Sequence, residues 1–208
     1  MATVVSFLLD ETGSMNQQMD DTIGSFNSYI ETLKEESDED VEYRFSLKKF
    51  CKQKRETLTK LSPLSEVPEL GRDNFFPGGS TPLVDASVNI IRDTQRWIEE
   101  EDIDPDNVIV TILTDGKENS SKENTNEDLS ELVNEKEEEG WEFVFLGVDI
   151  DAYQEAGKYD LATGNTISGD REKLNATMDA TARNTAKFAS EKKQDMSYSD
   201  EQKEELED

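Results

Sequence analysis

The chain opens with the stretch Val4-Val5-Ser6-Phe7-Leu8-Leu9-Asp10-Glu11-Thr12-Gly13-Ser14, in which an apolar run ends abruptly in oxygen-bearing side chains. A near-continuous apolar run is typical of a central parallel strand that is buried on both faces. Asp10, Thr12 and Ser14 alternate, so they can aim three oxygens to one side while Gly13 permits a tight turn. The stretch predicts a buried strand with a cluster of candidate ligands at its carboxyl end.

Two later segments repeat this chemistry. Gly78-Gly79-Ser80-Thr81-Pro82 is a tight loop that opens into a helical pattern, and Thr114-Asp115-Gly116 follows the apolar run 108–113. Carboxylates and hydroxyls without His or Cys suit Mg²⁺, Mn²⁺ or Ca²⁺ better than zinc or copper. The three segments together predict a site for a hard cation.

Strand-like runs alternate with segments of helical periodicity along the rest of the chain. The expected strands cover 4–9, 41–50, 52–61, 108–113, 141–148 and 165–167, and the expected helices cover 15–33, 83–99, 129–139, 152–161 and 171–189. The pattern predicts an α/β fold with a doubly wound, mostly parallel sheet, one antiparallel edge strand at 52–61, and helices on both faces. In such sheets ligands bind outside the carboxyl ends of the strands, where two of the three segments are expected.

In this order and at these positions, the segments Leu8–Met15, Gly79–Leu83 and Leu113–Asn119 resemble the metal-ion-dependent adhesion site of von Willebrand factor A (vWA) domains. The resemblance covers residues 1–190, and these segments together with Gly140–Gly147 look like those of compact vWA proteins from bacterial and tailed-virus genomes. It implies a vWA or Rossmann-like fold that binds Mg²⁺, or else Mn²⁺ or Ca²⁺. The metal ligands that it implies are Asp10, Thr12, Ser14, Thr81 and Asp115. Thr12 stands where the family more often has Ser, and it retains the hydroxyl.

The same residues also have ordinary structural explanations. Asp10 and Ser14 could cap a helix that begins near Met15. Thr81 could likewise be an N-cap, with Pro82 at the first helical position. Capping and metal binding can coexist, since a hydroxyl oxygen has two lone pairs.

Two neighbouring carboxylates are candidates for supporting hydrogen bonds around the ligands. Glu11 is expected to point away from the ligand set, and Asp85 lies one turn beyond Thr81, where it would also favour the start of a helix. The segment 117–119 is expected to be a solvated loop.

Acidic residues far outnumber basic ones. The 208 residues include 22 Lys and Arg against 49 Asp and Glu, for a formal net charge of -27. This charge repels nucleic acids and anionic membranes, so neither is expected as a partner. An acidic excess is also typical of proteins adapted to high salt, because screening there leaves little self-repulsion. We therefore expect a halophilic source.

The remaining features concern the compartment and the end of the chain. Cys51 is the single cysteine, which excludes an internal disulfide. The sequence lacks a secretory signal pattern and an apolar stretch of roughly 18 to 20 residues. We expect a cytoplasmic protein, or a virion-associated one if it is virus-encoded. Residues 191–208 are charged and poor in large apolar side chains, which predicts a disordered acidic tail after the domain of residues 1–190.

For function, the resemblance implies a binding module in which the Asp or Glu side chain of a partner protein occupies a free position on the cation. A virus-encoded structural or virion-associated component, acting through its acidic surface, is one alternative. A Mg²⁺-dependent hydrolase is another, but the chain has no His, no phosphate-binding Gly-rich loop and no second carboxylate cluster for a two-metal centre. We therefore expect that the protein is not an enzyme.

Overall fold

The computed structural model describes residues 1–52 and 54–207. Within this range one six-stranded sheet has the order β3-β2-β1-β4-β5-β6. The strands are β1 (Ala2–Asp10), β2 (Glu42–Cys51), β3 (Lys54–Pro63), β4 (Asn107–Thr114), β5 (Trp141–Val148) and β6 (Thr166–Gly169). Among these six described strands only β3 runs antiparallel to its neighbour, and it lies at one edge. The predicted doubly wound sheet with one antiparallel edge strand is confirmed.

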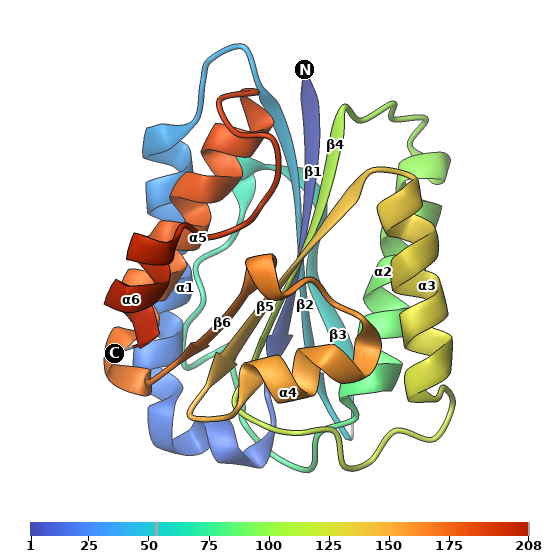
Figure 1. Ribbon diagram of the computed structural model, residues 1–208, viewed down its shortest axis with the longest axis vertical. Coiled ribbons are helices and arrows are strands. Elements are labelled where there is room, and N and C mark those ends of the chain that lie inside the picture. Colours follow the sequence, from blue (N-terminus) through green and yellow to red (C-terminus); the bar gives the residue numbers. More distant parts are fainter. Residues whose placement is uncertain (53, 208) are drawn as a thin grey trace.

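Helices cover both faces of the sheet (Figure 1). They are α1 (Met19–Glu36), α2 (Leu83–Glu100), α3 (Asn126–Glu138), α4 (Ala152–Ala156), α5 (Leu174–Ala189) and α6 (Asp200–Glu207). Short 3-10 turns cover Gly13–Gln18, Leu64–Glu66, Gly157–Tyr159, Thr163–Asn165 and Arg171–Lys173. In Figure 1, α1, α5 and α6 lie on one side of the sheet, and α2 and α3 lie on the other. None of the helices in the described part of the chain is long and apolar enough to cross a membrane.

Two apolar cores lie on opposite faces of the sheet, because successive side chains of a strand point to opposite sides. On β1, Phe7 belongs to the core under α1 and α5, whereas Leu8 belongs to the core under α2 and α3. The ring of Phe7 meets those of Phe26 and Tyr29 edge-on, with centroids 5.4 Å apart in each case. The continuous apolar run of β1 is thus buried on both sides, which fixes this strand at the centre of the sheet.

The C-terminal segment differs from the expected disordered tail. Residues 191–207 fold back onto the domain, and α6 packs against β6 and α5. Met196, Tyr198 and Leu206 are buried, and the Tyr198 hydroxyl shares a hydrogen bond of 2.6 Å with Thr181. The composition misleads here because a few well-placed apolar side chains are enough to dock a charged helix beside a short edge strand.

Candidate metal site

The three candidate segments meet at one end of the sheet. β1 pairs in parallel with β4, and the register places Leu9 opposite Leu113. Asp10 and Thr114 therefore end neighbouring strands at the same edge. The loop before α2 joins them through the backbone of two glycines, since Gly13 N donates to Gly79 O at 3.0 Å. Gly79 has a φ of 79°, a left-handed conformation that favours glycine.

Hydrogen bonds link the five candidate residues into one cluster. Ser14 Oγ donates to Asp115 Oδ1 at 2.6 Å and shares a bond of 3.2 Å with Thr12 Oγ1. Thr81 Oγ1 donates to Thr12 Oγ1 at 3.4 Å. Asp10 Oδ1 accepts from the backbone N–H of Thr12 at 2.7 Å. The structure thus brings together all five residues that the sequence singled out.

The cluster is buried at one side and open at the other. Asp10, Thr12 and Thr81 are at most 3% exposed, whereas Ser14 is exposed and Asp115 is half-buried. A ligand in this cluster would have Asp10 at its floor and would reach solvent past Ser14 and Asp115.

Asp10 and Asp115 form a pair of carboxylates with raised pKa values. Burial raises the pKa of Asp10 to about 7, and the negative charge of Asp115 adds to the rise against opposing hydrogen bonds from Thr114 and Thr12. Burial also raises the pKa of Asp115, with a smaller contribution from the charge of Asp149. Among the residues described, no Lys or Arg forms an ion pair with Asp10 or Asp115. Such a donor set could hold a hard divalent cation.

Residues 1–52 and 54–207 contain no group of three or more His, Cys, Asp or Glu side chains placed to hold a metal ion. A site at this edge would therefore depend on hydroxyl as well as carboxylate oxygens.

The capping explanations are wrong. The helix expected from Met15 begins with a 3-10 turn, and neither that turn nor α1 has a side-chain cap. Pro82, not Thr81, is the N-cap residue of α2, and it too makes no side-chain cap bond. Instead Glu118 Oε2 accepts from Val84 N at 2.8 Å at the start of α2. Among the described residues, the Thr81 hydroxyl bonds to Thr12 and caps no backbone group of α2.

Glu11 points away from the ligand cluster, as expected, into a buried ion pair. Its carboxylate lies 2.8 Å from Lys49 Nζ and 3.1 Å from Lys54 Nζ, and it accepts from Phe76 N at 2.7 Å. The backbone of Glu11 also binds the loop, since its carbonyl accepts from Gly78 N at 2.9 Å. Glu11 therefore holds the loop that leads to Thr81.

Asp85 does not reach the ligand cluster. It organises the loop after β4, because its carboxylate accepts from the backbone N–H groups of Lys122, Glu123 and Asn124 at 2.8 to 3.3 Å. Burial alone would raise the pKa of Asp85, but these hydrogen bonds hold it below its ordinary value.

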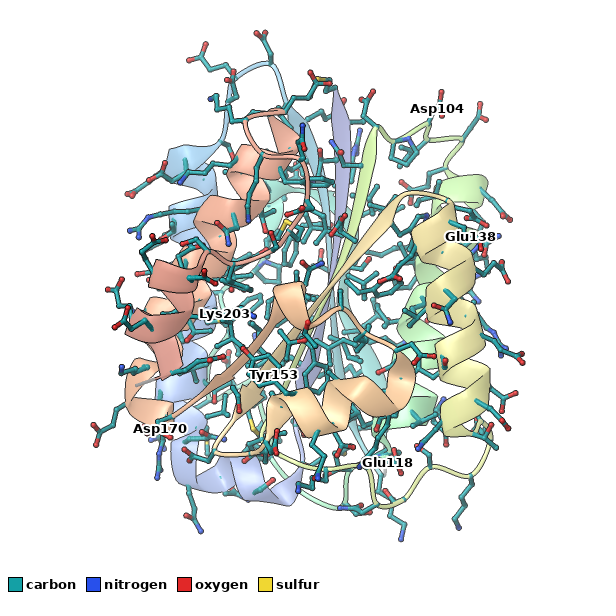
Figure 2. All side chains as sticks on the ribbon, viewed as in Figure 1. Asp104, Glu118, Glu138, Tyr153, Asp170 and Lys203 are labelled. Carbon is teal, nitrogen blue, oxygen red and sulfur yellow. The ribbon has the colours of Figure 1, made fainter. Side chains whose placement is uncertain are left out.

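Several supporting residues were not identified from the sequence. Gln18 Nε2 donates to Asp115 Oδ2 at 2.7 Å, and Thr114 Oγ1 donates to Asp10 Oδ2 at 2.6 Å. Thr114 adjoins Asp115 in the motif and could have been considered, whereas nothing in the sequence distinguishes Gln18. Segment 117–119 is not merely a solvated loop: Asn119 exchanges two hydrogen bonds with the backbone of Thr81, at 2.9 and 3.1 Å. In Figure 2, Glu118 lies at the end of the molecule where β1 finishes, opposite Asp104.

No protein-family model and no curated protein matches the sequence, but solved structures match the fold. A von Willebrand factor type A structure from Catenulispora acidiphila gives a TM-score of 0.60 at 11% identity, over 89% of this chain and 43% of that chain. The vWF domain of the type V pili tip protein Mfa5 from Porphyromonas gingivalis gives a TM-score of 0.60 at 10% identity, and the match covers 88% of this chain and 94% of that domain's chain. The manganese-loaded TRAP protein from Plasmodium vivax gives a TM-score of 0.58 at 17% identity, and the match covers 84% of this chain and 71% of that chain.

These identities are low, so the likeness concerns the fold alone. This chain spans less than half the length of the Catenulispora chain and of a mussel byssus thread matrix protein that it also matches. The similarity to the vWF domain of Mfa5 extends over nearly the whole of both chains. Together with the sheet order and the single antiparallel edge strand, it leads to one conclusion: the chain has the fold of a von Willebrand factor A domain.

Proposed function

We propose that this protein is a metal-dependent protein-interaction module that captures an Asp or Glu side chain of a partner protein. The residues that would hold the cation are Asp10, Thr12, Ser14, Thr81 and Asp115. The observation that carries the proposal is the convergence of two carboxylates and three hydroxyls from three loops, with no ion-paired Lys or Arg among the described residues to neutralise them.

The chemistry of this donor set supports Mg²⁺ or Mn²⁺, with Ca²⁺ as an alternative. A bound dication would supply positive charge and a coordination position that an incoming carboxylate can occupy. Asp10 and Asp115 would contribute the negative charge, and the hydroxyls of Thr12, Ser14 and Thr81 would contribute neutral oxygens. The opening past Ser14 and Asp115 would admit the partner's side chain.

The structural relatives agree with an interaction role. The TRAP structure from Plasmodium vivax is manganese-loaded, and Mfa5 is a pilus tip protein. We propose binding rather than catalysis, because the candidate cluster supplies one carboxylate pair only, too few for a two-metal hydrolytic centre.

Metal titration tests the proposal directly. Wild-type protein, pretreated with chelator, should bind Mn²⁺ or Mg²⁺ in calorimetry, and the Asp10→Asn variant should not. Asn retains an acceptor for Thr12 N and removes a buried charge, so the metal-free variant should melt at or above the wild-type temperature at pH 8. Asp104→Asn, at the opposite end of the molecule, is the matched control and should bind as wild type does. No binding by the wild type would contradict the proposal.

Thr81 separates a ligand role from a purely structural one. Thr81→Ala should lose metal binding and metal-dependent capture of a short peptide that contains one Asp, while Thr81→Ser should keep most of both. The stability cost of Thr81→Ala should be about 1 kcal/mol or less, since its hydroxyl makes only a long bond to Thr12 and caps no helix. Thr111→Ala, which removes a buried hydroxyl that has no hydrogen-bond partner within residues 1–52 and 54–207, is the control. Equal metal affinity in wild type and Thr81→Ala would leave the ligand role without support.

A further inference from the structure

A basic hollow lies beside the candidate metal site, in a protein that is otherwise strongly acidic. It has a volume of about 310 Å³. Its charged lining consists of Lys52, Lys54, Arg55, Lys122, Asp85 and Glu123. Four of these six side chains are basic, although the whole chain has 22 basic residues against 49 acidic ones. The lining of the hollow thus has more basic than acidic side chains, whereas the molecule as a whole is strongly negative.

The hollow and the candidate site share a loop. Pro82 lines the hollow and directly follows Thr81. On the other side, Lys52 N donates to the carbonyl of Ser80 at 3.0 Å, which ties the β2–β3 turn to the same loop. A ligand that occupied the site at Thr81 could therefore extend into the hollow.

Both acidic side chains of the lining are already engaged. The carboxylate of Asp85 accepts backbone hydrogen bonds from residues 122–124, and Glu123 pairs with Arg55 at 2.7 Å. Lys54 is shared between Glu11 and Glu56. Lys52 and Lys122 are exposed and make no ion pair with any residue in the described ranges. Two lysines are thus available to an incoming anion.

Uncommitted hydrogen-bond donors border the same region. The hydroxyl oxygens of Ser80 and Ser120 are buried and have no partner among the described residues. Ser120 lines the hollow, and Ser80 precedes Thr81. Phe76 lies next to Lys54, whose Nζ is 5.6 Å from the centroid of the Phe76 ring. Phe76 is 57% exposed. An exposed aromatic side chain beside a binding face is typical of a contact with a partner protein.

From this arrangement we infer that the hollow binds further acidic side chains of the same partner segment whose carboxylate is captured at Thr81 and its neighbours. The inference rests on the proposed function and adds to it the chemistry of the partner: an acidic peptide segment. At physiological salt the Debye length is about 8 Å, so the adjacent lysines outweigh the distant acidic surface for a ligand in contact. A nucleic acid is disfavoured, because its backbone would extend past the hollow over that acidic surface.

Two peptides of equal length measure this preference. One has a single Asp in a Gly/Ser background, and the other has the same Asp followed by several Glu residues. With Mg²⁺ present, the wild-type chain should bind the Glu-rich peptide roughly tenfold more tightly than the single-Asp peptide. The ratio of the two affinities is the readout, because it cancels changes in the overall charge of the protein.

The double variant Lys52→Glu/Lys122→Glu should reduce this ratio to about one. Lys34→Glu/Lys187→Glu changes the net charge equally at two exposed lysines near the ends of α1 and α5, and it should keep the wild-type ratio. An unchanged ratio in the first variant, or an equal fall in both, would overturn the inference.

A chelator arm separates this inference from the proposed function. Chelator should abolish binding of both peptides. Binding that survives chelator but is lost in Lys52→Glu/Lys122→Glu would support the hollow and contradict capture through a metal. A preference of the wild type for a single-stranded oligonucleotide over the Glu-rich peptide would overturn the choice of an acidic protein partner.

Discussion

Thr81 fits closely against the loop that follows β4. A Cβ atom added to Gly116 would stand 2.8 Å from Thr81 Oγ1 and 3.3 Å from its methyl carbon. Gly116 is not in the left-handed backbone region, so contact with Thr81 is the reason a side chain is excluded here. The absence of a side chain at Gly116 thus allows the Thr81 hydroxyl to take its position.

We predict that Gly116→Ala displaces Thr81 and lowers Mn²⁺ affinity roughly tenfold, as is usual when a residue that orients a ligand is changed. The measurement is calorimetric titration of chelator-treated protein. Gly157→Ala is the control, since a Cβ there meets no atom within 4 Å. If the two alanine variants bound metal alike, the contact between Gly116 and Thr81 would have no bearing on the site.

Sequence patterns could single out the five candidate residues because each of the three segments that carry them has a recognisable local pattern. Asp10, Thr12 and Ser14 follow a strand whose apolar run is unambiguous, and Asp115 follows another. The supporting residues depend on tertiary contacts instead: Gln18 meets Asp115 from 97 positions away, and Glu118 meets Val84 from 34 positions away. No local pattern encodes such pairings. The alternative interpretation of Thr81 as a helix cap is wrong for the same reason, since the distant carboxylate of Glu118 accepts from the backbone at the start of α2.

Among the elements, α2 and the loop after β4 are joined by two carboxylates, the buried one of Asp85 and the partly exposed one of Glu118. Asp85 on α2 holds the backbone of residues 122–124, and Glu118 on the loop holds Val84 N. Each element thus supplies an acid that satisfies the backbone donors of the other. This reciprocal arrangement positions Asn119 against Thr81 and forms one wall of the basic hollow.

This arrangement predicts a pH dependence. The pKa of Asp85 is lowered in the folded protein, so its stabilisation is fully present above the unfolded pKa of about 3.9 and is lost as pH falls through the folded value. Asp85→Asn, which cannot accept as many N–H bonds, should reduce the free energy of unfolding by about 2 kcal/mol at pH 7.

Urea unfolding between pH 7 and pH 2.5 checks this prediction. The difference between the wild type and Asp85→Asn should shrink as the solution becomes more acidic. Asp104→Asn, an exposed control, should follow the wild type throughout. A difference that stayed constant with pH would show that the Asp85 carboxylate does not act through its charge.

The segment after α5 is the element that composition predicted wrongly. Leu206 is 2% exposed, and its carbonyl oxygen would lie 3.1 Å from a Cβ on Gly169 in β6. At the end of α6, Glu207 accepts from the N–H of Ser168 at 3.0 Å and from the Tyr153 hydroxyl at 2.6 Å. The helix therefore covers the exposed edge of the sheet through contacts that its charged sequence does not reveal.

Because Leu206 is buried where α6 packs on the sheet, Leu206→Ala should reduce the free energy of unfolding by about 2 kcal/mol, the lower end of the range for a buried leucine. Glu204→Ala, on the exposed side of the same helix, should stay within about 0.5 kcal/mol of the wild type. Urea unfolding of both variants at pH 7 is the measurement. If neither substitution changed the free energy of unfolding, the interpretation of this segment as a disordered tail would be supported instead.

Across the whole molecule, the net charge of -27 acts on folding and on ligand binding in opposite directions. Close acidic side chains repel one another in the folded chain, and salt screens that repulsion. The same negative field attracts a divalent cation to the site, and salt screens that attraction as well. A single property of the composition thus predicts two salt dependences of opposite sign.

In the presence of chelator, the melting temperature should rise as KCl increases from tens of millimolar to molar concentrations. Mn²⁺ affinity of the same protein, measured by calorimetry over the same series, should fall. Lys34→Glu/Lys187→Glu makes the chain still more acidic without touching the site, so it should steepen both dependences and leave their signs unchanged. A melting temperature that did not depend on KCl would remove the argument for adaptation to high salt. Metal affinity that did not fall with KCl would show that binding depends on the five local oxygens alone.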